Sequence, residues 1–129
     1  MIYTSLYTRE DFTCKCGCGL NAMDYDLLRV LDLIATHLGK PEIHCVWRCE
    51  KHNAEIGGAK RSYHKRGIAV DFHIDNTDTG IAYKWLCNVF EWKYGIIVYD
   101  WGIHLDLRDG CYRDDRRTEI EENTNAEGI

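Results

Sequence analysis

SYHKRGIAVDFHI, residues 62–74, is the stretch that decides the fold of this chain. From residue 68 onward, apolar side chains at every second position alternate with Ala69, Asp71 and His73. A period of two residues is typical of a half-buried strand, whose side chains point alternately to opposite faces. We therefore predict a strand with one face in the core and the other carrying side chains that can bind a metal ion.

A second stretch, IHLDLR at residues 103–108, repeats this alternation. When two such strands share a sheet and one core, their polar side chains point into the same cleft. The side chains expected on the cleft side are Asp71, His73, His104 and Asp106. His64 precedes the first strand and is expected to overhang the cleft from a loop.

Two amphipathic helices are expected, one on each side of residues 62–74. The first runs from a cap at residue 21 or 24 to about residue 37, and the second from a cap at residue 77 or 78 to about residue 92. The inward residues expected in the second helix are Ile81, Trp85, Leu86, Val89 and Phe90. Shorter elements are a strand at 43–46, a helix at 49–56 and a strand at 95–99 that forms a hairpin with 103–108.

Length and charge limit the class of protein. The chain has 129 residues, so we predict one domain over residues 1–118, with a cysteine-rich arm at 1–20 and a polar, flexible tail at 119–129. The net charge of −5 argues against a nucleic-acid partner. No run reaches the roughly 18–20 apolar residues of a membrane span, so no membrane insertion is expected. The first residues lack the pattern of a secretory signal, and we expect synthesis in the cytoplasm.

Seven cysteines are many for a chain of this size, and an odd number cannot all pair internally. Three of them, Cys14, Cys16 and Cys18, lie within five residues. They are consistent with reduced structural thiols, with disulfide partners for Cys45 and Cys49, or with a soft metal site. Zinc sites usually use Cys-x2-Cys to Cys-x4-Cys pairs, and only the outer pair has such a spacing.

A metal hydrolase site is indicated by three residues taken together. A catalytic zinc site uses about three protein ligands, from histidine and carboxylate side chains, and keeps one position open for water. His64, Asp71 and His104 would supply such a set. Each residue alone is more often a surface or hydrogen-bonding residue, but the combination favours zinc.

Residues 62–71 match the SxHxxGxAxD signature of the zinc D-alanyl-D-alanine carboxypeptidase family, which includes phage endolysins and vancomycin-resistance dipeptidases. Upstream, the segment WRCEKHNAEIGGA at 47–59 is similar to the YRxxxHNxxxGG segment of that family. Downstream, GIHLDLR at 102–108 resembles its VHVDVR strand. The resemblance extends over roughly residues 12–110, with the blocks in the same order and spacing.

The resemblance implies an α+β fold: a small antiparallel sheet with helices packed on one face and a zinc site on the open face. It implies that His64, Asp71 and His104 are the zinc ligands. It also implies that Arg48 and Ser62 hold the substrate carbonyl or carboxylate, which suits the planar donors of arginine and a nearby hydroxyl. A structural ion pair for Arg48 and a turn-capping hydroxyl for Ser62 remain alternatives.

The general base is less defined by the resemblance. Many relatives carry an acid three residues before the last histidine, where this chain has Trp101. Asp100 is the nearest acid, and His73 and Asp106 are the other candidates because both lie on the ligand face. For Asp106 we favour a different role, as the hydrogen-bond partner of a zinc-bound histidine.

The sequence therefore predicts a zinc-dependent peptidase that hydrolyses a bond involving a D-amino acid in peptidoglycan stem peptides, as a carboxypeptidase or an endopeptidase. We expect a monomer, encoded by a phage or prophage, that reaches the cell wall through a holin or as part of a virion. The alternatives are an inactive, zinc-containing binding module of the same fold and a disulfide-rich interaction domain without a metal.

Overall fold

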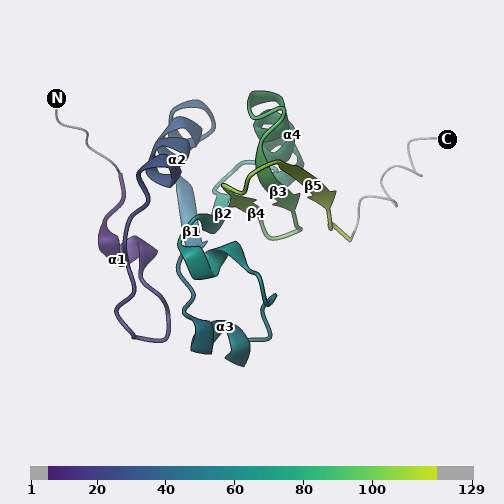
Figure 1. Cartoon of the computed structure of the whole chain (residues 1–129). Helices are drawn as coiled ribbons and strands as arrows, with labels where there is room; N and C mark the ends of the chain where they lie inside the picture. Colours follow the sequence, from purple (N-terminus) through teal and green to yellow (C-terminus); the bar gives the residue numbers. More distant parts are fainter. Residues whose placement is uncertain (1–5, 119–129) are drawn as a thin grey trace.

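The computed structural model describes residues 6–118, which form a small α+β fold, as expected (Figure 1). The tail predicted for 119–129 and the first five residues of the arm lie outside the described residues. In chain order the elements are α1 (Arg9–Phe12), α2 (Tyr25–His37), β1 (Pro41–Cys45), α3 (Glu50–Glu55), the 3-10 helix η1 (Tyr63–Arg66), β2 (Ala69–Ile74), α4 (Thr79–Val89), β3 (Tyr94–Val98), β4 (Ile103–Asp106) and β5 (Cys111–Asp115).

The strands form one sheet in the order β1-β2-β4-β3-β5. All neighbours are antiparallel except β3 and β5, which pair in parallel from Tyr94 opposite Cys111 to Val98 opposite Asp115. No strand was predicted beyond residue 110, and β5 corrects that expectation. Its sequence, CYRDD, lacks apolar alternation because β5 is an edge strand with little buried surface.

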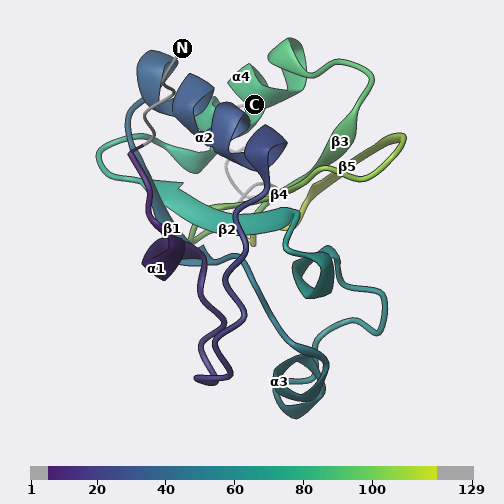
Figure 2. The same cartoon turned by 60° about the vertical axis from the view of Figure 1, so that its left-hand side comes forward.

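The core lies between one face of the sheet and the helices α2 and α4, which Figure 2 shows on the same side of the strands. The apolar side of β2 is buried here, with Val70 and Phe72 fully enclosed. Helix α2 begins after Asp24, whose carboxylate accepts a hydrogen bond from the Leu27 backbone N–H at 3.0 Å. The predicted strand alternation and the first helix are therefore confirmed.

The predicted inward face of α4 is wrong in part. The helix ends at Val89 rather than near residue 92, and Ile81 and Val89 are exposed. The buried positions are Ala82, Leu86 and Phe90, which are spaced by four residues and so lie on one side of the helix axis. The small Ala82 is therefore buried while the larger apolar residues Ile81 and Val89 are not, which apolarity alone does not indicate.

The segment between β1 and β2 carries α3 and η1 and leaves the helix-covered face, so that α3 lies on the opposite side of the sheet from α2 and α4 (Figure 2). It re-enters the sheet through Gly67, which has a φ of +70°. A Cβ at this position would lie 2.3 Å from the ring of Trp47. Glycine is therefore required both by the left-handed backbone and by the close approach of the indole.

Candidate metal centre

Three side chains converge on the open side of the sheet from three different elements. Asp71 on β2 and His104 on β4 are register partners in adjacent antiparallel strands. His64 belongs to η1 and is 1% exposed. Strand pairing thus places two of the residues opposite each other, and the turn before β2 brings the third above them.

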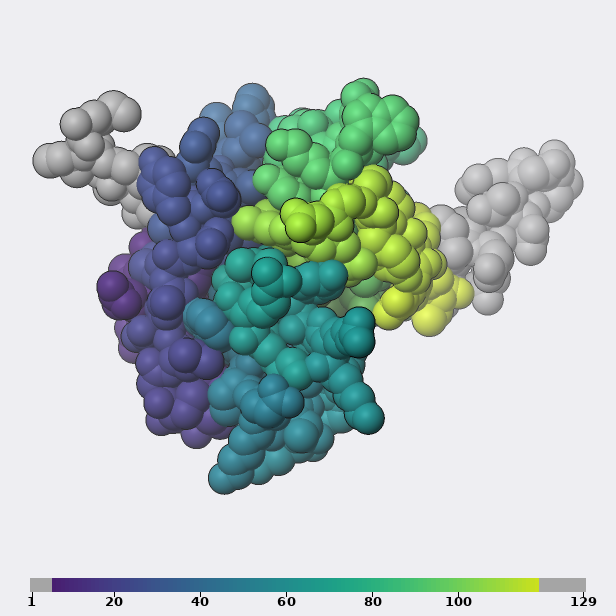
Figure 3. Space-filling model, in the orientation of Figure 1, coloured from purple at the N-terminus to yellow at the C-terminus, as the bar shows by residue number. Residues whose placement is uncertain are grey.

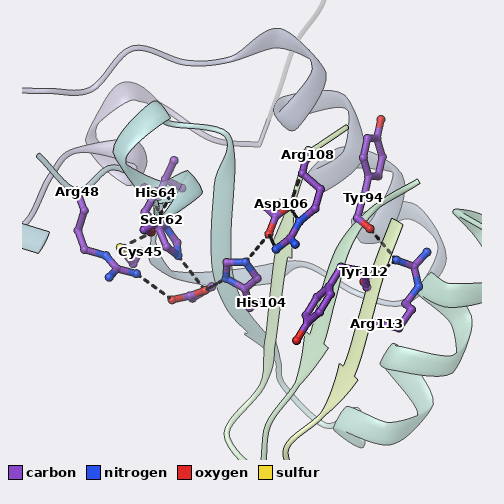
Figure 4. A network of polar contacts seen from close by, with 12 residues as sticks. Cys45, Arg48, Ser62, His64, Tyr94, His104, Asp106, Arg108, Tyr112 and Arg113 are labelled. Carbon is purple, nitrogen blue, oxygen red and sulfur yellow. Dashed lines mark hydrogen bonds and ion pairs between the residues drawn. The ribbon is translucent and has the colours of Figure 1, made fainter. Parts of the chain in front are cut away.

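The imidazoles of His64 and His104 turn toward each other in Figure 4, and the Asp71 carboxylate contacts both. Asp71 Oδ1 lies 3.1 Å from His64 Nε2 and 2.8 Å from His104 Nδ1. One ligand atom from each of the three residues can be chosen so that all lie within 4.8 Å of one another. A mixed histidine and carboxylate set of this kind suits zinc and other divalent ions of intermediate softness.

The outward nitrogens of both histidines are held by acceptors. His64 Nδ1 lies 2.7 Å from the Val46 carbonyl oxygen, and His104 Nε2 lies 2.8 Å from Asp106 Oδ2. A carbonyl or carboxylate oxygen can only accept, so each imidazole donates outward, and its inward nitrogen is the one that can bind a metal once it gives up its proton. Metal-binding histidines in proteins usually have such partners, which fix the tautomer and the ring orientation.

The side chains of the cluster shift one another's pKa values through their hydrogen bonds. Burial lowers the pKa of His64, but hydrogen bonding to Asp71 outweighs it, and the pKa is raised to about 9. Burial raises the pKa of Asp71, but the hydrogen bonds from His104 and His64 lower it well below its ordinary value. For His104 the hydrogen bond to Asp106 likewise outweighs burial and raises the pKa. A site that binds protons this tightly offers the negative potential that a divalent cation requires.

Asp106 is completely buried and makes a two-point ion pair with Arg108. Arg108 Nε lies 2.7 Å from Asp106 Oδ1, and Arg108 Nη2 lies 2.8 Å from Oδ2. On β3, a Cβ at Gly95 would lie 2.7 Å from both carboxylate oxygens, so glycine makes room for the pair. Sequence reasoning did not find the roles of Arg108 and Gly95, although the Asp-x-Arg spacing of the downstream block was a signal for the first.

A cleft of about 400 Å³ opens above the cluster. It is lined mainly by cationic and aromatic side chains: Arg48, Arg61, Arg108, Arg116, Tyr63, Tyr99, Trp101 and Tyr112. Ser62 and the three clustered residues also line it, and Asp71 is the one carboxylate among the described residues that do so. Although the whole chain is acidic, this cleft therefore favours an anionic ligand.

Arg48 reaches the cleft from the segment before α3. Its Nη1 donates to Asn53 Oδ1 at 3.0 Å, and its Nη2 lies 3.9 Å from Asp71 Oδ2. Arg48 Nε is buried and has no hydrogen-bond partner within residues 6–118. A Cβ at Gly58 would collide with Asn53 and with the guanidinium, so Asn53 and Gly58 of the upstream block shape the pocket of this arginine.

Ser62 caps η1, and its hydroxyl oxygen accepts a hydrogen bond from the backbone N–H of His64 at 3.2 Å. The hydroxyl hydrogen is not used in this contact. Because Ser62 also lines the cleft, the same side chain can cap the turn and face a ligand.

The structure does not bring Asp100 or His73 to the three-residue cluster. The Asp100 carboxylate is exposed and accepts hydrogen bonds from the Thr118 backbone N–H and, at 2.7 Å, from its hydroxyl. His73 contacts His44, with 2.6 Å between Nδ1 and Nε2, and Asp75, with 2.9 Å between Nε2 and Oδ1.

Trp101, at the position where relatives carry an acid, lies at the cleft beside Asp100. Its ring stacks on Tyr99, with 4.9 Å between the ring centroids, and also contacts the ring of His44. An aromatic pair thus forms one side of the cleft at this position.

All seven cysteines lie within the described residues, and none forms a disulfide there. Cys45 lies near His64, with 3.7 Å between its Sγ and the imidazole Nδ1. Cys49 instead joins Cys14, Cys16 and Cys18 in a second cluster of potential ligands.

The fold and the three-residue cluster are consistent with a metal-dependent hydrolase, because histidine and carboxylate side chains that could hold a metal ion line an open cleft. The family model for peptidase M15 matches residues 5–106, most of the chain. The chain belongs to the peptidase M15 family, whose members are metal-dependent peptidases, and the resemblance seen in the sequence is confirmed. Searches among curated proteins and among solved structures gave no match. Within residues 6–118, no helix is both long and apolar enough to cross a bilayer.

Proposed function

We propose that this chain is a zinc-dependent peptidase that cleaves a peptide bond involving a D-amino acid in peptidoglycan stem peptides. The observation that carries the proposal is the convergence of His64, Asp71 and His104, with both outward imidazole nitrogens already held by acceptors. A zinc ion bound there would lower the pKa of a water ligand to about 7 and polarise a carbonyl group.

Arg48 is proposed to hold the oxygen that becomes negative as the bond is attacked. Its guanidinium lies at the cleft, with Nη2 3.9 Å from Asp71 Oδ2 and so beside the candidate metal centre. Preorganised donors of this kind stabilise a developing oxyanion more than the neutral carbonyl. Ser62, with a hydroxyl hydrogen to donate, is proposed to hold a substrate carbonyl or carboxylate on the same side of the cleft.

The cleft favours peptides with free carboxylates. Four arginines line it, and because Arg108 and Arg116 are paired with Asp106 and Asp114, Arg48 and Arg61 are the two proposed to meet a ligand carboxylate. Stem peptides with a terminal carboxylate fit this charge, which favours the carboxypeptidase mode over cleavage within a longer chain. By the resemblance to phage endolysins, we further propose a phage or prophage product that acts as a monomer on the cell wall, delivered by a holin or within a virion.

For the general base we propose Asp100. It belongs to the loop between β3 and β4, and its neighbours Tyr99 and Trp101 both line the cleft. Its carboxylate would have to leave Thr118 to accept a proton in the cleft. His73 stays an alternative that would have to leave His44 and Asp75, and Asp106 is proposed to orient His104.

A second candidate function is a metal-containing binding module that does not hydrolyse its ligand. The observation that favours it is the absence of a carboxylate other than Asp71 among the described residues that line the cleft. Such a module would bind the same anionic peptides, with Arg48 as the anchor.

The experiment is an incubation of metal-analysed protein with purified peptidoglycan, with and without a chelator, followed by mass spectrometry of the released peptides. Chelator-sensitive release that returns when zinc is added back supports the peptidase, and the fragment masses identify the bond. A metal-loaded protein that binds several wall types and cleaves none would support the binding module instead.

The variant Asp100→Ala tests whether Asp100 is the general base. If Asp100 is the base, this variant keeps its metal and loses turnover by about 10²-fold or more. The matched control is Asp109→Ala, which removes another acid that does not line the cleft. Equal rates for Asp100→Ala and the unmodified chain would exclude Asp100 as the base.

A further inference from the structure

We propose that Cys14, Cys16, Cys18 and Cys49 form a second, structural Zn²⁺ site that clamps the N-terminal arm to the start of α3. One sulfur from each of the four residues lies within 4.8 Å of all the others. The arm and α3 lie side by side at the end of the molecule away from α2 and α4 (Figures 1 and 3).

The sulfur separations fit a tetrahedral zinc ion. Cys16 Sγ lies 3.5 Å from Cys14 Sγ and 3.5 Å from Cys49 Sγ. With Zn–S bonds of about 2.3 Å, tetrahedral geometry requires sulfurs about 3.8 Å apart, within the range that the four thiols span. Four thiolates leave no open position, so the site is structural rather than catalytic.

Backbone N–H groups donate hydrogen bonds to two of the four sulfurs. The Cys49 backbone N–H donates to Cys14 Sγ at 3.4 Å, and the His52 backbone N–H donates to Cys49 Sγ at 3.4 Å. Such donors stabilise a thiolate, the form that binds metal. The loop itself is closed by a bond of 2.9 Å from the Cys14 N–H to the Leu20 carbonyl.

Two glycines allow three cysteines to share one loop. Gly17 and Gly19 have φ values of +88° and +90°, which side chains with a Cβ rarely adopt. With these turns, the CKCGCG segment folds back on itself, and Cys14, Cys16 and Cys18 point toward one centre. The short Cys-x-Cys spacing is thus accommodated by backbone conformation rather than by the usual longer gap between ligands.

Binding is a simple exchange of protons for metal. Four thiols take up one Zn²⁺ and release up to four protons, so the centre carries a formal charge of −2 and no oxidant or reductant is needed. The thiols of Cys16 and Cys18 are exposed and Cys14 is buried, which gives the ion a path from solvent and an anchor in the fold.

The clamp would position Arg48. This residue directly precedes Cys49, and its own N–H donates to the His64 carbonyl at 3.0 Å. On the other side, the Trp47 N–H donates to the Phe12 carbonyl at 3.3 Å, which is a further tie to the arm. A zinc ion that joins Cys49 to the arm would therefore hold the segment that carries Arg48 to the cleft.

The test is the metal content of the full chain, prepared under reducing conditions and analysed by mass spectrometry in the native state. We expect two zinc ions in the unmodified chain and one in Cys16→Ser. His64→Ala should also retain one, because it removes the other centre. Cobalt substituted into His64→Ala should give the intense thiolate charge-transfer bands of a tetrahedral four-sulfur site, a signal that the histidine centre cannot produce.

Two control variants distinguish loss of a zinc ligand from loss of zinc caused by misfolding. Cys111→Ser changes an exposed cysteine outside the cluster and should keep both ions. Cys18→His replaces one zinc ligand by another and should keep the second ion where Cys18→Ser loses it. Hydrogen exchange at residues 46–53 should be faster in Cys16→Ser than in Cys111→Ser, while exchange in β2 and β4 is unchanged.

Several results would overturn the proposal. One is a zinc content in Cys16→Ser equal to that of the unmodified chain, and another is a His64→Ala variant that binds no zinc. Alkylation of the denatured, unreduced chain at fewer than seven cysteines would show a disulfide in place of the zinc site. Unchanged exchange at residues 46–53 in Cys16→Ser would overturn the positioning of Arg48.

Discussion

Two His-x-Asp pairs lie on β4 and at the end of the adjacent strand β2, and only the pair on β4 belongs to the candidate metal centre. His104 and Asp106 are 14% and 0% exposed, whereas His73 and Asp75 are 37% and 71% exposed. The contact between imidazole Nε2 and carboxylate is nearly the same, 2.8 Å in the first pair and 2.9 Å in the second. Local geometry therefore does not distinguish them.

The register of the strands distinguishes the two pairs. His104 lies directly opposite Asp71, so its free nitrogen faces a carboxylate. The pairing of β2 with β4 ends at Phe72, and His73 pairs with Glu42 on β1 instead. Its free nitrogen consequently faces His44, which supplies no negative charge. What a His-x-Asp pair binds is decided by the third group that the neighbouring strand places beside it.

The largest expected difference is between His104→Ala and His73→Ala. Removing His104 leaves two ligands, too few for a stable zinc site, so one zinc ion and the hydrolytic activity should be lost. His73→Ala should keep the zinc ion. Metal analysis of both purified variants tests this, and a full metal complement in His104→Ala would refute the ligand assignment.

The second-largest difference is expected between Asp106→Ala and Asp75→Ala, in zinc affinity and in stability. Asp106→Ala leaves Arg108 without its partner and frees His104 to rotate, so we expect zinc affinity to fall about 10–100-fold. The free energy of unfolding should fall by roughly 3 kcal/mol, since one side of a buried ion pair is lost. Asp75→Ala is the matched control and should change stability by less than about 0.5 kcal/mol.

Those differences are measured by competition with a metal indicator and by denaturant unfolding. If Asp75→Ala weakened zinc binding as much as Asp106→Ala does, the two pairs would be equivalent and burial would not be the deciding factor.

A smaller effect is expected from Gly95→Ala, which crowds the buried pair without removing it. The new Cβ would lie 2.5 Å from Arg108 Nε and 2.7 Å from the Asp106 oxygens. We expect a loss of about 1–3 kcal/mol in unfolding free energy. In an Asp106→Ala background the same change should cost less, so the two substitutions should be non-additive in a double-mutant cycle. Strict additivity would show that Gly95 acts independently of the pair.

The smallest expected effect is on the pH dependence of stability, and it comes from His44, which contacts His73 of the exposed pair. Burial, followed by the nearby charge of His73, lowers the pKa of His44 below its ordinary 6.5. A histidine with a lowered pKa in the folded state stabilises the fold above pH 6.5, and this contribution is lost as pH falls through that value. In the zinc-loaded chain, His44→Ala should therefore show a shallower loss of thermal stability between about pH 7 and pH 5. Parallel curves would contradict this contribution.

Much of the fold could be predicted because its signals are local. The alternation at residues 68–74 and the Asp24 cap each depend on neighbours within a few residues. Strand β5 could not be predicted, since an edge strand is defined by its hydrogen bonds to β3 rather than by its own polarity. The buried face of α4 was partly missed for a similar reason, because it depends on which side of the helix packs against the rest of the fold.

The candidate ligands were identifiable from motif spacing, but their environment was not. The sequence offers both Cys45 and Cys49 as partners of the arm cysteines, and only the fold selects Cys49, since the contact spans 33 residues and needs the arm to fold onto α3. Nor does spacing show that the Asp100 carboxylate is bound to Thr118.

The sequence by itself determined the family, the strand that carries Asp71 and the residue types available to bind a metal, because motif spacing and side-chain alternation are properties of neighbouring residues. Tertiary structure alone decided which histidine faces a second carboxylate, which acid is buried with Arg108 and which cysteines meet. The physical reason is that charge, burial and ligand distance depend on strand register and on chain segments far apart in sequence. Two chemically identical His-x-Asp pairs thereby have different surroundings in one sheet.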